Sequence, residues 1–161
     1  MVQLNSGNSK VTVPGSVTVP AGGSWADFPV TVNGTVTSPQ TGQINATYAG
    51  TTRSAPFTVR LISVHHINIF GSEVRGGHPF SGQAVLECSN STVPIAVTLS
   101  TDLPSVAFIS NPSSGSLVIP AGQLTSSTIT VETNPVAIPT FVQVRGTANG
   151  RSGTGSIGVI P

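Results

Sequence analysis

Charged side chains are scarce in this chain. Asp, Glu, Lys and Arg together make up 7% of its 161 residues, and the formal net charge is +1. An ordinary soluble chain has about a quarter of its residues charged. The six basic residues form no run along the sequence. The electrostatic field of so weakly charged a protein does not attract nucleic acid or an acidic membrane surface. Neither is therefore expected as a partner.

Cysteine, aromatic residues and long apolar runs are also few. Cys88 is the single cysteine, which excludes an intrachain disulfide, and aromatic residues make up 5% of the chain. No segment approaches the roughly 20 apolar residues of a membrane-spanning helix, so no membrane span is predicted. Residues 1–25 lack the basic start and the apolar core of a signal peptide. If the protein is exported, this chain is expected to be a mature or internal piece of it.

The residues that are abundant belong to short strands and the turns between them. The chain has 18 Gly and 13 Pro, and Val, Thr and Ser recur throughout. Apolar and polar residues alternate with a period of two in many segments, whereas the helical period is absent. The hydrophobic fraction of 37% and this alternation argue against a disordered chain. The sequence therefore predicts an all-β fold.

The chain repeats itself at a fixed distance. A Pro-Ala-Gly tripeptide occurs twice, and 100 positions separate Pro20 from Pro120. Residues 43–50 and residues 143–150 share a second pattern at the same spacing. A fixed period of this kind indicates tandem modules of one fold.

The Pro-Ala-Gly tripeptide is predicted to form a tight turn in both copies. Proline presets the backbone φ for the second position of a turn, and it cannot donate into a strand ladder, so it ends the strand before it. Glycine suits the last position of the same turn. Asn149-Gly150 is a further hairpin signal, and Ala49-Gly50 holds the same place in the first copy. The predicted turn residues are Pro20, Ala21, Gly22, Pro120, Ala121 and Gly122.

The second copy has enough strands for a complete module. Seven or eight strands in about a hundred residues are typical of an antiparallel β-sandwich. We therefore predict a complete sandwich in residues 61–161, with a bend at Gly76-Gly77 after its first strand. The expected strands are residues 63–70, 82–88, 95–100, 106–109, 116–119, 127–132, 140–146 and 155–160.

The first copy, residues 1–60, is predicted to be incomplete. It has no counterpart of residues 61–96, which contain the first two expected strands. Its alternating apolar residues then lack cover on one face, and two strand edges are open. A sandwich of about sixty residues is also marginal by size alone. Two explanations stay open: the missing strands lie upstream in a longer protein, or a neighbouring chain supplies them.

These patterns resemble bacterial immunoglobulin-like surface repeats. The resemblance covers essentially the whole chain. It implies immunoglobulin-like β-sandwiches in a secreted or cell-surface protein, and it implies no catalytic residues. Together with the internal repeat, it predicts two tandem immunoglobulin-like β-sandwiches, the first lacking its first two strands. Ala148 stands in the second copy where the family pattern has a tyrosine. The first copy carries the patterns at residues 4–6 (LNS), 17–22 (VTVPAG) and 45–50 (NATYAG), and the second at 99–101 (LST), 117–122 (LVIPAG) and 147–150 (TANG).

No constellation of catalytic or metal-binding residues is predicted. His65 and His66 are adjacent in an expected strand, so their side chains should point to opposite faces and not share a metal. The five acidic residues are scattered, without the clustered carboxylates that calcium requires. Cys88 is expected to be a free, partly buried thiol, because the sequence places no base or oxyanion hole beside it. We therefore predict no enzyme activity, no metal and no cofactor.

A few residues are candidates for contacts rather than chemistry. Trp25, the only tryptophan, follows the first Pro-Ala-Gly turn and either caps the end of the core or touches a partner. The junction between the two copies is expected at Arg60, Leu61, His65 and His66. No linker rich in Gly or Ser separates the copies, so limited flexibility is expected there.

The sequence is compatible with three non-catalytic functions. The first is a spacer or stalk of tandem repeats in a bacterial extracellular or cell-surface protein, whose partners are neighbouring repeats. The second is a filament subunit, in which identical protomers complete one another's incomplete sandwich by strand complementation. The third is an adhesion or carbohydrate-binding module, whose surface ligand the sequence does not name.

Overall fold

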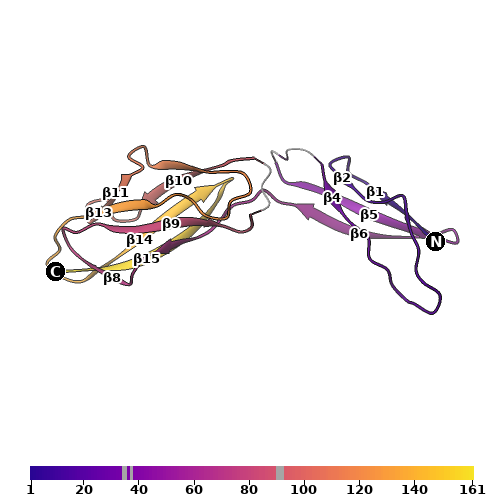
Figure 1. The fold of residues 1–161 in the computed structure, drawn as a ribbon, viewed down its shortest axis with the longest axis horizontal. Helices are drawn as coiled ribbons and strands as arrows, with labels where there is room; N and C mark the ends of the chain where they lie inside the picture. Colours follow the sequence, from indigo (N-terminus) through magenta and orange to yellow (C-terminus); the bar gives the residue numbers. More distant parts are fainter. Residues whose placement is uncertain (34–35, 37, 90–92) are drawn as a thin grey trace. The chain divides into compact units, whose positions relative to one another are not determined.

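The regular structure of this protein consists of β-strands. The computed structural model describes residues 1–33, 36, 38–89 and 93–161. Every regular element within these residues is a strand, as Figure 1 shows, which confirms the predicted all-β fold class. The chain forms two compact units, Met1–Leu61 and Ile62–Pro161. The boundary expected from the sequence lay one residue earlier, after Arg60.

The second unit is a sandwich of two sheets. A five-stranded sheet has the order β12-β10-β14-β15-β8, and a four-stranded sheet has the order β11-β13-β9-β7. All of its strand pairings but β8–β15 are antiparallel, so the predicted β-sandwich is confirmed. Its strands are β7 (Val64–Ile69), β8 (Glu73–Arg75), β9 (Phe80–Leu86), β10 (Ile95–Thr101), β11 (Ala107–Asn111), β12 (Ser116–Ile119), β13 (Ile129–Thr133), β14 (Thr140–Ala148) and β15 (Arg151–Ile160).

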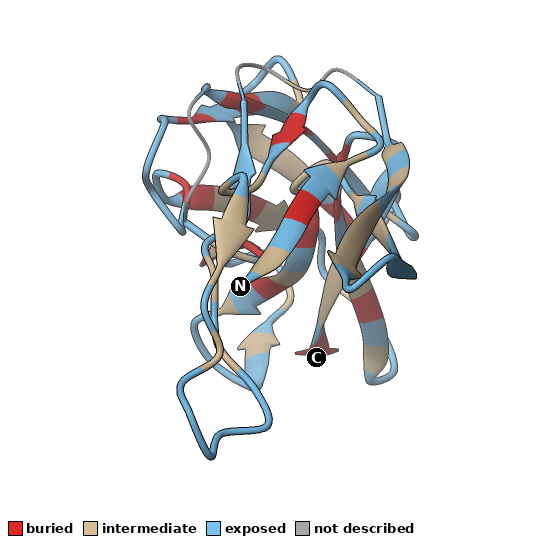
Figure 2. Ribbon diagram, turned by 90° about the vertical axis from the view of Figure 1, so that its right-hand side faces the viewer, coloured by how far each residue is buried: buried red, intermediate tan, exposed pale blue. Residues whose placement is uncertain are grey.

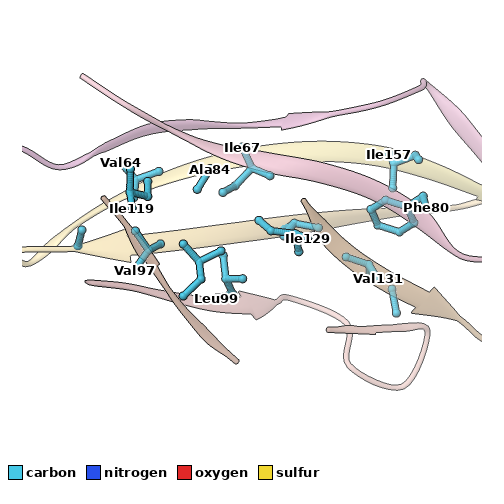
Figure 3. Close-up of a cluster of buried hydrophobic side chains, with 14 of the residues drawn as sticks. Val64, Ile67, Phe80, Ala84, Val97, Leu99, Ile119, Ile129, Val131 and Ile157 are labelled. Carbon is cyan, nitrogen blue, oxygen red and sulfur yellow. The ribbon is translucent and has the colours of Figure 1, made fainter. Parts of the chain in front are cut away.

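The core of the second unit forms because its strands alternate apolar and polar residues. In β10, Ile95, Val97 and Leu99 are buried, while the residues between them are exposed. Eighteen buried hydrophobic residues from both sheets form one cluster in the described chain, and Figure 3 shows the side chains of most of them between the strands. Each large aliphatic or aromatic side chain buried in this way contributes about 1.5–3 kcal/mol relative to an exposed one. The sandwich is therefore held together mainly by this cluster.

The short strand β8 was not predicted. It pairs in parallel with the end of β15, with Glu73 opposite Gly158 and Arg75 opposite Ile160. Three residues are too few for the alternation of a strand to stand out in the sequence. The bend expected at Gly76-Gly77 follows this strand, and Gly77 has a φ of 87°.

The first unit contains two smaller sheets. One has the order β3-β1-β5-β6, and the other consists of β2 and β4. All of the pairings in them are antiparallel. Its strands are β1 (Val2–Ser6), β2 (Val11–Thr12), β3 (Ser16–Val17), β4 (Thr31–Val32), β5 (Gln40–Tyr48) and β6 (Thr51–Val59).

The larger sheet of the first unit has the same strand register as part of the second unit. Leu4 of β1 pairs with Ala46 of β5, as Leu99 of β10 pairs with Gly146 of β14. The β5–β6 pairing runs from residues 40 and 59 to residues 48 and 51, and the β14–β15 pairing runs from 140 and 159 to 148 and 151. The order β3-β1-β5-β6 thus corresponds to β12-β10-β14-β15.

The hairpins at the ends of these strands match as well. Ala49 and Gly50 have φ values of 48° and 81°, and Asn149 and Gly150 have values of 50° and 77°. Positive φ at both central residues is what a type I′ turn requires. Next to each turn, two hydroxyl oxygens lie 2.8 Å apart across the strands, at residues 47 and 52 and at residues 147 and 152.

The first unit has fewer strands than the second. Its described residues contain no strand that corresponds to β7, β8 or β9. The sequence predicts two missing strands, whereas the structure gives three, because the second unit also contains the short strand β8. In the second unit two of the three, β7 and β9, belong to the four-stranded sheet, and β8 extends the other sheet.

Candidate functional site

His65 and His66 lie closer together than their adjacent positions in a strand predicted. A bulge interrupts the pairing of β7 with β9 between Val64 and His66, which re-aims the side chains. Their Nδ1 atoms lie 2.8 Å apart, within hydrogen-bonding distance, and the rings meet edge to face. The expectation that these side chains point to opposite faces is therefore wrong. Within the described part of the chain, no group of three or more His, Cys, Asp or Glu is placed to hold a metal ion.

Cys88 follows the end of β9, next to a residue that forms an ion pair. The thiol is free and of intermediate exposure. Beside it, Glu87 accepts a hydrogen bond from the Arg151 guanidinium at 3.2 Å. Both side chains of this ion pair are substantially exposed, so the pair contributes at most about 1 kcal/mol.

The chain turns at both Pro-Ala-Gly tripeptides. The N–H of Gly23 donates to the carbonyl of Pro20 at 2.9 Å, and the N–H of Gln123 donates to the carbonyl of Pro120 at 3.1 Å. Proline is thus the first residue of each turn, one place earlier than predicted. The residue at the third place is Gly22 or Gly122, with φ values of 79° and 77°. A positive φ at this place is typical of a type II turn and explains the glycine.

Replacing Gly122 with alanine is expected to destabilise the second unit by about 1 kcal/mol. A Cβ at this residue meets nothing within 4 Å, so the loss comes from the left-handed backbone alone. Urea unfolding of the full chain, followed by far-UV circular dichroism, measures it. Gly122→Asn is the control, because asparagine tolerates this conformation better than alanine. Equal stability of the alanine variant and the parent chain would contradict the assigned turn.

The residues predicted for contacts are spread over both units. Trp25 is 72% exposed, which does not fit a cap on a core. The loop at residues 20–25, drawn pale blue in Figure 2, is exposed along its whole length. Arg60 and Leu61 end the first unit, whereas His65 and His66 belong to β7 of the second. The partner contact of Trp25 and the junction role of the other four residues stay predictions.

The most unusual surface of the protein is an uncovered apolar face on the first unit. Leu4 and Val11 are the only buried hydrophobic residues that its described part contains, with 8% and 2% of their surface exposed. Val30 and Val32 alternate at β4, and Tyr48 continues the alternation of apolar residues in β5, yet these three residues are 50%, 44% and 63% exposed. Apolar residues of this spacing normally meet a second layer of strands. This face is the candidate functional site, and we call it the open face.

An open hollow lies beside the few buried residues of the first unit. Its volume is about 250 Å³, and its lining comes from β1, β2 and the segments next to them, including Leu4, Val11 and Val13. Protein interiors are close-packed, with few voids larger than a water molecule. Most of the residues that line this hollow are polar, including Asn5 and Asn8, and it is open to solvent, so it is a depression of the surface rather than a void in a core.

Two strand edges accompany the open face. Among the described residues, β6 has a neighbour only on the side of β5, and β4 has one only on the side of β2. An unpaired edge presents N–H and C=O groups to which another strand can add. Pro56 lies in β6, which suits an edge strand because proline has no N–H to offer a neighbour.

The two most exposed large apolar residues in the described part of the second unit were not predicted as contacts. Ile138 is 71% exposed, and Phe141 in β14 is 78% exposed. Phe141 precedes the buried Val142 and Val144, so the alternation of β14 directs it away from the core. The alternation of apolar and polar residues in this part of the sequence is enough to predict that Phe141 points outward.

Comparisons with known proteins identify no family for this chain. No family model matches it, and no curated protein matches it. Among solved structures, domains 4–9 of the surface layer protein SbsC match 99% of this chain at 16% identity and a TM-score of 0.41. The native conformation of E. coli alpha-2-macroglobulin matches 90% at 14% identity and a TM-score of 0.45. This chain covers 30% and 10% of those two chains, and likeness at this level carries no argument about function.

The open face and the strand edges beside it are suited to association with another β-segment. The open face offers apolar side chains, and the edges beside it offer backbone hydrogen-bonding groups. These are the two elements of recognition by strand addition. No helix in the described residues is long and apolar enough to cross a membrane.

Proposed function

We propose that this chain is a non-catalytic structural part of a bacterial extracellular or cell-surface protein, namely a spacer of tandem immunoglobulin-like repeats. The observation that carries the proposal is the repeated strand register. Two units share the order β3-β1-β5-β6 and β12-β10-β14-β15, with β5–β6 and β14–β15 paired in the same register 100 positions apart. Tandem copies of one unit form arrays whose length is set by the number of repeats.

The second unit has the construction that a load-bearing spacer requires. The pairing of β14 with β15 runs without interruption over nine residue pairs, from residues 140 and 159 to residues 148 and 151. Its buried side chains lock the two sheets together. To pull this unit apart, a force must break the hydrogen bonds between β14 and β15 and separate the buried side chains at the same time.

The mechanical part of the proposal is tested by stretching single molecules of the full chain between Met1 and Pro161. The second unit, Ile62–Pro161, is expected to open in one step and to lengthen the chain by roughly 3.3–3.6 Å for each residue released. The open first unit should yield at a much lower force. Gradual lengthening of the second unit without a force peak would contradict a load-bearing role.

The location is tested separately, with an antibody raised against the second unit. Intact source cells should be labelled as strongly as permeabilised cells if the protein is exposed at the surface. Labelling that appears only after permeabilisation would refute a cell-surface or extracellular place.

The open face also favours a second candidate, the filament subunit completed by identical protomers. An unpaired edge next to exposed apolar residues is the feature that strand complementation uses. Light scattering over a concentration series distinguishes the candidates. A spacer stays monomeric in this assay, whereas a filament subunit forms dimers and longer polymers as its concentration rises. The third function, adhesion or carbohydrate binding, depends on the exposed Trp25, and quenching of its fluorescence by a surface glycan would favour it.

A further inference from the structure

The open face of the first unit has a covered equivalent in the second. There, β7 lies against β15 and β14, and β9 joins β7 to β13. Ala148 in β14 is 3% exposed, whereas Tyr48, at the same register position of β5, is 63% exposed. The second unit therefore shows what occupies this face when a unit is complete. The covering residues are Val64 and Ile67 of β7 and Phe80, Ala84 and Leu86 of β9.

The other layer shows the same contrast. The N–H of Asn33 donates to the carbonyl of Lys10 at 2.8 Å, as the N–H of Asn134 donates to the carbonyl of Val106 at 2.8 Å. This equivalence aligns residues 28–33 with residues 129–134. Val131 is then the counterpart of Val30, and the two are 1% and 50% exposed. In the second unit β9 continues the sheet beside Val131, with Phe80 as its direct partner in the ladder.

The edges indicate where a covering segment would pair. In the second unit β8 pairs with residues 158–160 of β15. The corresponding residues 58–60 lie at the end of β6 and just after it, and within the described chain they have no strand partner on the side away from β5. On the other side, Pro29 stands where β13 has Thr130. Proline has no N–H, so a ladder on that side is weakened. The apolar face then provides most of the attraction, and the β6 edge provides most of the hydrogen bonds.

A second copy of this chain is a poor donor of such a segment. Its own β7 and β9 are already packed, and withdrawing them would expose Val64, Ile67 and Phe80, which are each at most 6% exposed. In the second unit the covering strands also precede β10 directly, through residues 87–94. Since β10 corresponds to β1, a segment joined ahead of β1 reaches the open face by the same short connection.

We propose that the first unit is an acceptor for a three-stranded β-segment of the β7–β8–β9 type, joined to the chain ahead of Val2. The segment places alternating apolar residues over Tyr48, continues the sheet beside Val30 and Val32, and adds backbone hydrogen bonds at Thr58 and Val59 of β6. The proposal rests on the tandem-repeat part of the proposed function and is independent of a surface location.

The acceptor differs from its template at one corner. In the second unit a Cβ at Gly153 would lie 2.6 Å from the backbone of His65, and a Cβ at Gly155 would collide with the carbonyl oxygen of Ile67. Arg53 and Ala55 occupy the corresponding places in β6. The bound segment therefore lies farther from β6 at this corner than β7 does from β15. We expect the residue of the bound segment that faces Ala55 to be small, because Ala55 has a Cβ where Gly155 has none.

The test adds the missing segment to the full chain. A copy of residues 62–95 is joined directly to Met1, since Met1 corresponds to Ala96 in the shared register. A second extended chain also carries Arg53→Gly and Ala55→Gly, so that β6 matches β15 at the corner. Hydrogen exchange of residues 40–59 is measured by mass spectrometry, with residues 140–159 of the same molecule as the reference for a folded unit. Binding of the dye ANS reports exposed apolar surface.

In at least one extended chain, exchange in residues 40–59 is expected to slow by about tenfold or more, and ANS binding should fall. The matched control carries Ile67→Asp and Ala84→Asp in the added copy only, and it should show neither change. Exchange as fast as in this control for both extended chains would overturn the proposal. Concentration-dependent protection of residues 40–59 in the unextended chain would also overturn it, because a second copy would then be the occupant. Neither result alters the stretching or cell-labelling tests of the proposed function.

Discussion

The variant Gly155→Ala is expected to lower the free energy of unfolding of the second unit by about 3 kcal/mol or more. A Cβ added at this residue of β15 collides with the carbonyl oxygen of Ile67 in β7. The obstacle is backbone, and β7 is held in place by its pairing with β9 and by the buried side chains of Val64 and Ile67. The strain cannot be relieved by turning a side chain. It must separate the two sheets at this corner.

Gly158→Ala in the same strand is the matched control. Its Cβ would lie 3.5 Å from the nearest atom, an ordinary van der Waals contact, so we expect a change below about 1 kcal/mol. Hydrogen exchange of residues 140–159 during urea unfolding measures both variants. Tryptophan and tyrosine fluorescence is unsuitable, because Trp25 and Tyr48, the only residues of those types, both lie in the first unit. Equal stability of the Gly155→Ala and Gly158→Ala variants would contradict the prediction. It would mean that β7 lies farther from β15 than the structure shows.

The strand pattern of the second unit was predictable because side-chain burial there follows sequence alternation. Each of the eight expected strands overlaps an observed one, from β7 to β15 with β8 left out. Hairpin positions were also predictable, since Asn149-Gly150 has few other backbone choices. Both signals are local, so a single sequence contains them in full.

Features that depend on contacts between distant segments were not predictable. The parallel strand β8 exists because residues 73–75 meet the end of β15, far away in the sequence. The bulge that brings His65 and His66 together depends on how β7 pairs with β9. The close approach of β7 to Gly155 likewise arises from the packing of two sheets. No pattern within a few residues reports any of the three.

The open face was predictable only in part. The missing counterpart of residues 61–96 indicated that apolar residues of the first unit lack cover, and Val30, Val32 and Tyr48 are indeed exposed. The sequence did not show that Arg53 and Ala55 stand where the second unit needs glycine, because the role of Gly153 and Gly155 is visible only in the packed sandwich. Because of these two side chains, a segment that covers the first unit must pack differently at this corner from the way β7 packs on β15.

The second large effect is expected for Ile119→Ala at the end of β12. Ile119 has no exposed surface and belongs to the buried cluster of the second unit. Removing its side-chain carbons leaves a cavity in a close-packed core, and substitutions of this kind lower the free energy of unfolding by about 2–5 kcal/mol. A loss of this size is a large share of the total stability of a small domain. Urea unfolding followed by far-UV circular dichroism and by hydrogen exchange of residues 140–159 measures it.

The neighbouring residue supplies the control for that variant. Val118 lies in the same strand but points outward and is 58% exposed, so Val118→Ala should change stability by no more than about 0.5 kcal/mol. The two substitutions share their strand and their distance from the Pro120 turn, and they differ mainly in burial. Similar losses for both variants would mean that β12 does not present Ile119 to the core. A large loss for Ile119→Ala alone would establish that the buried cluster, rather than the strand itself, holds β12 in the sandwich.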